Sequence, residues 1–145
     1  MQFLESLQNH YEIIAWTSSQ SDYTHLLVDV IQKTLNFKFD YFLSLSNQTP
    51  SEEKEFFAKN LEILTGYGSR TNQDIIIVDC QMSSFTKSLT NGVFLPSYRI
   101  HEDKNDFILN SLQNYLLSFV MLEVIDVRSK IKLDFEMLKK FNGLK

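Results

Sequence analysis

The chain has 145 residues, a length typical of a single domain. Hydrophobic residues make up 43% and charged residues 22%, which excludes a disordered chain and a long coiled coil. The formal net charge of −4 leaves no broad basic surface, so we expect no nucleic-acid partner. The lone cysteine, Cys80, excludes an internal disulfide and a cysteine-based zinc cluster.

Helix and strand patterns alternate along the chain. Apolar residues at helical spacing predict helices near 3–7, 23–31, 107–125 and 131–141, with a short helix or turn at 83–89. The Thr-Pro-Ser-Glu-Glu sequence that begins at Thr49, with acids in the first turn, predicts another helix at 49–64. Apolar or β-branched runs predict strands at 11–16, 37–45, 75–78 and 93–95. This order predicts an α/β fold with a doubly wound parallel sheet and helices on both faces. The most apolar window, 115–125, is too short to cross a membrane.

Polar side chains that could bind a ligand or take part in catalysis follow two of the predicted strands. Thr17 and Ser18 follow the first predicted strand, and Asp79 and Cys80 follow the strand at 75–78. In a doubly wound sheet, ligands bind beyond the carboxyl ends of the strands. A functional interpretation therefore starts at these two places.

Several sequence words resemble one known family. The run F-L-E-S-L-Q-N-H-Y-E-I-I-A-W-T from Phe3, then I-I-I-V-D-C ending at Cys80, N-G-V from Asn91 and D-V-R from Asp126 occur in the order and spacing of that family. The chain resembles the small CTD-phosphatase/NLI-interacting-factor-like domain, a branch of the haloacid dehalogenase superfamily. It is also similar to the degenerate copy of that domain in the mitochondrial inner-membrane import receptor.

The resemblance implies roles for three residues. Thr17 would hold a phosphoryl oxygen, Lys59 would neutralise the phosphoryl group, and Asp79 would help to hold Mg²⁺. The family's nucleophile is the first aspartate of a D-x-D-x-[TV] motif, and no such motif occurs in these 145 residues. Cys80 replaces the usual second acid or amide, and a thiol is a poor ligand for a hard cation. We therefore treat Thr17, Lys59 and Asp79 as vestigial positions and expect no functional catalytic residue, metal or other cofactor.

Each of these residues also has a structural interpretation. Thr17 and Ser18 would cap the next helix, Lys59 would be a solvated charge, and Asp79 would cap the turn at 81–84. Cys80 would be a buried, inert thiol. The three histidines share no metal-ligand spacing and are expected at the surface or on helix flanks: His10, His25 and His101.

The resemblance also implies that the usual central first strand is missing. It divides the chain into a phosphatase-like α/β domain at 1–128 and a helical extension at 129–145. The strands ending at Thr17 and Asp79 would then pair directly, or another polypeptide would donate a strand beside Tyr11–Trp16. The helix predicted at Phe107–Ile125 is apolar on more than one side, so other protein subunits could pack on it.

The prediction is therefore a catalytically inactive phosphatase-like domain that serves as an accessory subunit of a larger assembly. A mitochondrial location follows by analogy with the import receptor, with nuclear or cytoplasmic locations as alternatives. Two other functions remain open. One is half of a split Mg²⁺-dependent serine/threonine phosphatase that another chain completes. The other is a phosphopeptide-binding module that uses Thr17, Ser18 and Lys59.

Overall fold

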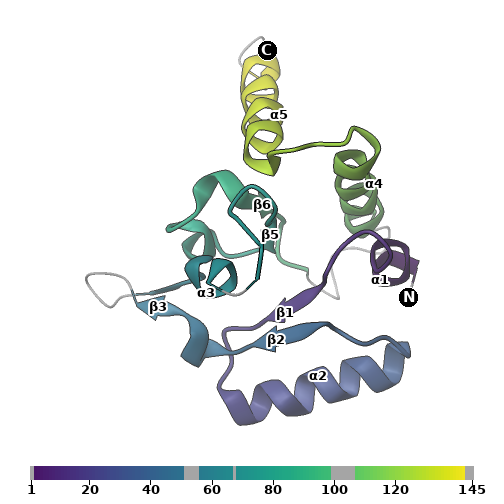
Figure 1. The fold of residues 1–145 in the computed structure, drawn as a ribbon, viewed down its shortest axis with the longest axis vertical. Coiled ribbons are helices and arrows are strands. Elements are labelled where there is room, and N and C mark those ends of the chain that lie inside the picture. The colour runs from purple at the N-terminus through teal and green to yellow at the C-terminus, as the bar shows by residue number, and fades with distance from the viewer. Residues whose placement is uncertain (1, 51–55, 67, 99–106, 143–145) are drawn as a thin grey trace. The chain divides into compact units, whose positions relative to one another are not determined.

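A computed structural model describes residues 2–50, 56–66, 68–98 and 107–142, with side chains for 3–50, 56–66, 68–98 and 107–136 (Figure 1). The chain forms two compact units. The first consists of Met1–Gln48 and Asp103–Met121, and the second of Thr49–Glu102 and Leu122–Lys145. In the part of the chain that the structure describes, no helix is long and apolar enough to span a bilayer.

The first unit is built on a parallel β-α-β arrangement. Strands β1 (Ile14–Trp16) and β2 (Tyr41–Leu43) pair in parallel, and α2 (Ser21–Leu35) connects them (Figure 1). Parallel strands need such a crossover because a short hairpin reverses the chain direction. Asn36 ends α2 in the left-handed conformation with φ 49°, and its N–H donates to the Gln32 carbonyl.

Two further helices complete the first unit. Helix α1 (Gln2–Leu7) packs against α4 (Ile108–Met121), and a short 3₁₀ turn spans Leu45–Asn47. The Tyr11 hydroxyl donates to the Leu116 carbonyl at 2.6 Å. The core of this unit is made of buried apolar side chains: Leu7, Val28, Phe37, Leu112, Leu116 and Phe119.

The second unit contains two small sheets. Strands β5 (Ile77–Asp79) and β6 (Gly92–Phe94) pair in parallel, and β3 (Thr49–Pro50) pairs antiparallel with β4 (Phe57–Ala58). Helix α3 (Glu62–Thr65) lies between β4 and β5 in the sequence, and the 3₁₀ turns η2 (Met82–Phe85) and η3 (Leu89–Asn91) lie between β5 and β6. Helix α5 (Val127–Asn142) contacts η3.

The core of the second unit brings the short elements into close contact. Its buried apolar side chains are Ala58, Leu61, Ile77, Phe85, Val93, Val127 and Ile131. A Cβ on Gly92 would lie 2.6 Å from the Phe85 ring, so β6 begins with the residue that lets this ring pack closely.

The mixed α/β class is confirmed, with parallel and antiparallel pieces in place of the single parallel sheet expected. Each described sheet lies within one unit, and the absence of a central strand stays a prediction. The expected helix at 49–64 is wrong for the described residues, because Thr49–Pro50 and Phe57–Ala58 form a ladder and only α3 is helical. The extended backbone there brings the Lys59 N–H to the Ser84 carbonyl at 3.2 Å.

Candidate functional site

A buried ion pair lies at the carboxyl end of β5. The Lys59 Nζ donates to Asp79 Oδ2 at 2.6 Å, and the two side chains are 7% and 12% exposed. Lys59 follows β4 directly, and Asp79 is the last residue of β5. The second carboxylate oxygen, Oδ1, accepts the Gln81 N–H at 2.9 Å. The expectation of a solvated Lys59 is therefore wrong: Asp79, twenty residues away in the sequence, supplies the counter-charge that permits its burial.

The environment of Asp79 favours its ionised form. Burial by itself raises the pKa of Asp79, but hydrogen bonds from Lys59, Ser84 and the Gln81 N–H outweigh burial and lower the pKa below its usual value. The Gln81 bond also confirms that Asp79 caps the turn at 81–84. The site is thus a carboxylate whose charge is balanced by one ammonium group and by neutral donors.

The residues of this site do not fit the Mg²⁺ that the resemblance implies. A hexacoordinate Mg²⁺ needs several hard oxygen ligands, and both oxygens of Asp79 already accept protein donors. The neighbouring Cys80 offers sulfur. Among the described residues, no three His, Cys, Asp or Glu side chains gather where they could hold a metal ion. No step through a metal follows from this arrangement.

Thr17 and Ser18 belong to a separate polar network in the first unit. Thr17 Oγ1 accepts the Ser19 N–H at 3.1 Å, while Gln48 Nε2 donates to Ser18 Oγ at 3.1 Å and to the Thr17 carbonyl at 3.3 Å. The expectation that they cap α2 is wrong. The cap position is Gln20, without a side-chain cap bond, and α2 begins only at Ser21. Because Ser18, Ser19 and Gln20 separate Thr17 from α2, the Thr17 hydroxyl stabilises the turn that follows β1 and not the start of the helix.

The structure brings Lys59 and Asp79 together, and it places Thr17 in the other unit. Cys80 is exposed, so the expectation of a buried thiol is wrong. It follows the last residue of β5 and begins the turn, where the core no longer covers it. His10 and His25 are exposed as expected, and His25 packs edge-on against Phe42. His101 lies outside the described residues.

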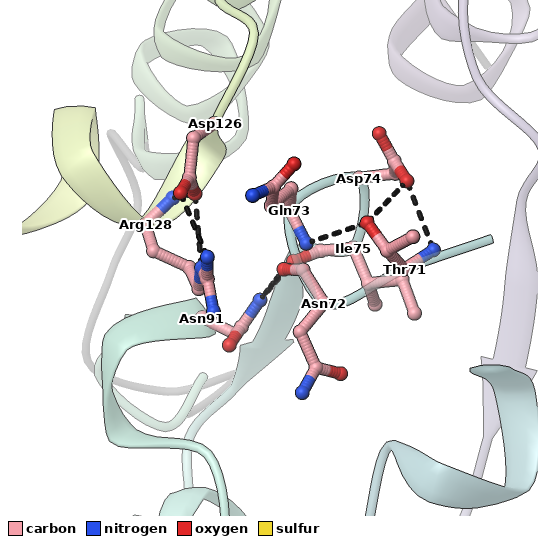
Figure 2. Close-up of polar contacts among 8 residues, drawn as sticks. All are labelled: Thr71, Asn72, Gln73, Asp74, Ile75, Asn91, Asp126 and Arg128. Carbon is pink, nitrogen blue, oxygen red and sulfur yellow. Dashed lines mark hydrogen bonds and ion pairs between the residues drawn. The ribbon is translucent and has the colours of Figure 1, made fainter.

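Sequence reasoning missed the side chains that fix the start of β5. Figure 2 shows the Asn91 amide reaching the segment before this strand: Nδ2 donates to the carbonyls of Asn72 at 2.6 Å and Ile75 at 2.7 Å. Asn91 is only 2% exposed. The N-G-V sequence that resembles the family begins at Asn91 and could have drawn attention to this residue. Such a match does not by itself show which carbonyls the Asn91 amide contacts.

Two further contacts fix this segment, and Figure 2 shows the one inside it, between Asp74 and Thr71. Asp74 Oδ2 accepts both the N–H and the hydroxyl of Thr71, at 2.9 and 2.8 Å. The Val127 N–H at the start of α5 donates to the Gln73 carbonyl at 3.0 Å. Just before, Asp126 forms a two-pronged ion pair with Arg128, which lowers the pKa of Asp126. The segment 71–75 therefore enters β5 in a fixed position.

Comparison with known proteins adds two findings. Residues 1–128 match the family described as NLI interacting factor-like phosphatase. The chain is also 26% identical over 136 residues to a protein of Dictyostelium discoideum named CTD small phosphatase-like protein 2. That match covers 94% of this chain and 22% of the relative, so the chain spans less than a quarter of the relative's length.

Proposed function

We propose that this chain, which belongs to the NLI interacting factor-like phosphatase family, is a phosphatase-like domain that does not turn over phosphoesters and acts as an accessory part of a larger assembly. The observation that carries the proposal is the direct 2.6 Å contact between Lys59 and Asp79. Lys59 neutralises a carboxylate of its own chain there, and neither charge is available to a ligand without breaking a buried pair.

The energetics of the pair support this assignment. Removing one member of a buried ion pair costs about 3–5 kcal/mol, because the other charge is left uncompensated. A phosphate that bound Lys59 would separate it from Asp79 and leave this carboxylate without its ammonium partner, and a magnesium ion that bound Asp79 would also break the 2.6 Å contact. Either ligand would have to offset this cost before it gained any affinity.

The sequence supports the proposal from a second side. Phosphoryl transfer through an aspartyl-phosphate needs a carboxylate nucleophile with a second acid close by. The D-x-D-x-[TV] motif that supplies both in this family does not occur within these 145 residues. The name of the Dictyostelium relative describes a protein much longer than this chain, so its activity comes to this chain only as a hypothesis.

A turnover assay tests the proposal. The purified chain is incubated with magnesium chloride and a phosphoserine peptide, beside Asp79→Asn and the exposed-site control Asp29→Asn. We expect release of phosphate equal to the buffer rate in all three samples. Turnover that persists in Asp29→Asn and disappears in Asp79→Asn would refute the proposal. An epitope-tagged chain that migrates at its own mass in a native extract would refute the accessory role.

A split phosphatase is the second candidate, and one observation favours it. Lys59 and Asp79 match two positions of the family motif, and the fold holds them side by side at a strand end, where the ligands of α/β proteins bind. If a second polypeptide supplied the aspartate motif, its new charges could reorganise the pair. Mixing the chain with a peptide that carries D-x-D-x-T flanked by β-branched residues, with Mg²⁺, should then generate turnover that Asp79→Asn abolishes. Continued inactivity of the mixture, with peptide binding demonstrated, would remove this candidate.

A further inference from the structure

Strand β5 has a partner strand on one side only. It pairs with β6 in a two-stranded parallel sheet, and no other described strand of the second unit joins this sheet. The Asp79 carbonyl accepts the Leu95 N–H at 2.9 Å, so Asp79 directs its backbone groups towards β6. Successive residues of a strand direct these groups to opposite edges. Val78 therefore directs its N–H and C=O to the other edge of β5, where no hydrogen bond among the described residues reaches them.

The open edge of β5 lacks the usual protection against pairing. The residues whose backbone groups point to it are Ile76, Val78 and Cys80, and Val78 is 36% exposed in the middle of the strand. Proteins that keep a strand edge unpaired usually place lysine, proline or a bulge there. The opposite edge of the same sheet ends at Pro96, which has no N–H to offer. This difference indicates that the β5 edge, and not the β6 edge, receives another strand.

We propose that the open edge of β5 pairs antiparallel with the same edge of a second copy, around a two-fold axis at Val78. Val78 presents a donor and an acceptor to one edge, so the axis lets each Val78 N–H donate to the Val78 carbonyl of the other copy. A second copy is complementary to this edge by symmetry alone, whereas an unrelated strand would need a matching sequence. Residues 75–78 carry no charge, and the charge of Asp79 is balanced by Lys59 within each copy, so like charges do not oppose the pairing.

The two-fold axis fixes which residues face each other. Val78 lies opposite Val78, with the two Cα atoms about 5.5 Å apart as in any hydrogen-bonded antiparallel pair. A disulfide spans this distance without strain. Cys80 lies opposite Ile76 of the second copy, so the two Cys80 thiols are out of register and cannot meet across the contact. Residue 78 should therefore form a disulfide between copies, although Cys80 follows the strand and is exposed.

Disulfide cross-linking of the full chain tests this register. The test variant is Val78→Cys/Cys80→Ser, and two controls are the wild-type chain with Cys80 and the variant Phe94→Cys/Cys80→Ser, whose thiol lies on the exposed part of β6. Each sample is oxidised at about 100 µM, and the covalent dimer is measured on a non-reducing gel. We expect the test variant to cross-link at least about tenfold faster than both controls, because pairing holds its thiols at an effective concentration of about millimolar.

A second measurement does not depend on a new thiol. Val78→Pro removes the N–H that points to the open edge and leaves the bonds to β6 in place, whereas Phe94→Pro removes an N–H on the far edge of the same sheet. Sedimentation velocity of the reduced chains at up to about 100 µM, a range that detects micromolar affinity, should show a dimer for the wild-type chain and Phe94→Pro. The Kd of Val78→Pro should be at least about tenfold higher, since two hydrogen bonds are lost at the axis. Circular dichroism establishes that each variant is folded.

Several outcomes would overturn the proposal. A wild-type chain that stays monomeric throughout the concentration range contradicts it, as does a dimer that Val78→Pro does not weaken. Cross-linking through Cys80 or residue 94 as fast as through residue 78 would indicate random collision. A monomer that binds the D-x-D-x-T peptide described above, and loses it in Val78→Pro, would assign the edge to a strand of another polypeptide. The proposal does not rest on the proposed function, because the phosphate-release assay and these measurements have independent outcomes.

Discussion

Two strand ends of the molecule carry polar side chains with different partners. At the end of β1 in the first unit, these side chains form hydrogen bonds with neutral groups. At the end of β5 in the second unit, Asp79 forms an ion pair with a buried charge. Thr17 and Ser18 accept hydrogen bonds from a backbone N–H and from the Gln48 amide. Asp79 accepts one from the Lys59 ammonium group. Buried charges cost far more than buried amides when a partner is lost. The two strand ends should therefore differ sharply in their sensitivity to substitution, although the sequence resemblance singled out both of them.

Removal of the Asp79 side chain is expected to have the largest effect. Asp79→Ala removes the carboxylate that the Lys59 ammonium group contacts at 2.6 Å, and we expect a loss of about 3–5 kcal/mol in the free energy of unfolding, measured by urea denaturation. Asp29→Ala, at an exposed position of α2, serves as the control and should change it by less than about 0.5 kcal/mol. The double variant Lys59→Met/Asp79→Leu should recover most of the loss, because it removes both charges. Equal stability of Asp79→Ala and the control would show that the pair is not buried in solution.

The Asn91 amide tests whether neutral groups in the second unit matter as well. Asn91→Asp keeps the shape of the side chain but replaces the donor that serves the Asn72 and Ile75 carbonyls with an acceptor. We expect a loss of about 2–3 kcal/mol in the free energy of unfolding, because two carbonyls lose their donor inside the fold. Asn110→Asp on the exposed side of α4 is the matched control. A loss no larger than that of the control would mean that water replaces the amide.

The acid limb of the stability curve reports on Lys59 and Asp79 directly. Because the folded pKa of Asp79 is lowered, its contribution is fully present above the unfolded pKa of about 3.9 and is lost as the pH falls through the lower folded pKa. In Lys59→Met the folded pKa of Asp79 rises towards or above its unfolded value, so the stability that this group loses on acidification should be smaller than in the wild-type chain. Urea midpoints between about pH 3 and pH 7 give the two curves, and contributions common to both chains, such as that of Asp126, cancel in their difference. Parallel curves would contradict the coupling of Lys59 to Asp79.

The sequence predicted the parts of the fold that depend on local pattern. Apolar residues at helical spacing correctly indicated α2, α4 and α5, and the β-branched run at 75–78 correctly indicated β5 to within a few residues. The segment at 49–64 failed because its Thr-Pro-Ser-Glu-Glu start is typical of a helix, while the observed ladder depends on contacts of Ala58 and Lys59 with distant η2. Periodicity contains no information about such non-local partners.

The site shows the same division. Thr17, Lys59 and Asp79 could be selected from the family words, but the burial of Lys59 depends on a counter-charge twenty residues away that no local rule identifies. The exposure of Cys80 depends on where β5 ends, and a shift of one residue decides which side of the strand end is covered. Gln48 and Asn91 appear in the sequence as ordinary polar residues, and only the three-dimensional fold shows that their amides serve carbonyls in remote segments.

The smallest effect is expected at the neutral strand end. Gln48→Ala removes the amide that donates to Ser18 Oγ and to the Thr17 carbonyl, and the Ser18 hydroxyl can turn to solvent once the amide is gone. We expect a loss of about 1 kcal/mol in the free energy of unfolding by urea denaturation, the usual net value of a neutral hydrogen bond. Gln81→Ala is the control, because its side chain is exposed and only its N–H contributes to the Asp79 site. A loss at Gln48 as large as that at Asp79 would show that the two strand ends are equally sensitive, and the contrast between neutral and charged ends would then have to be given up.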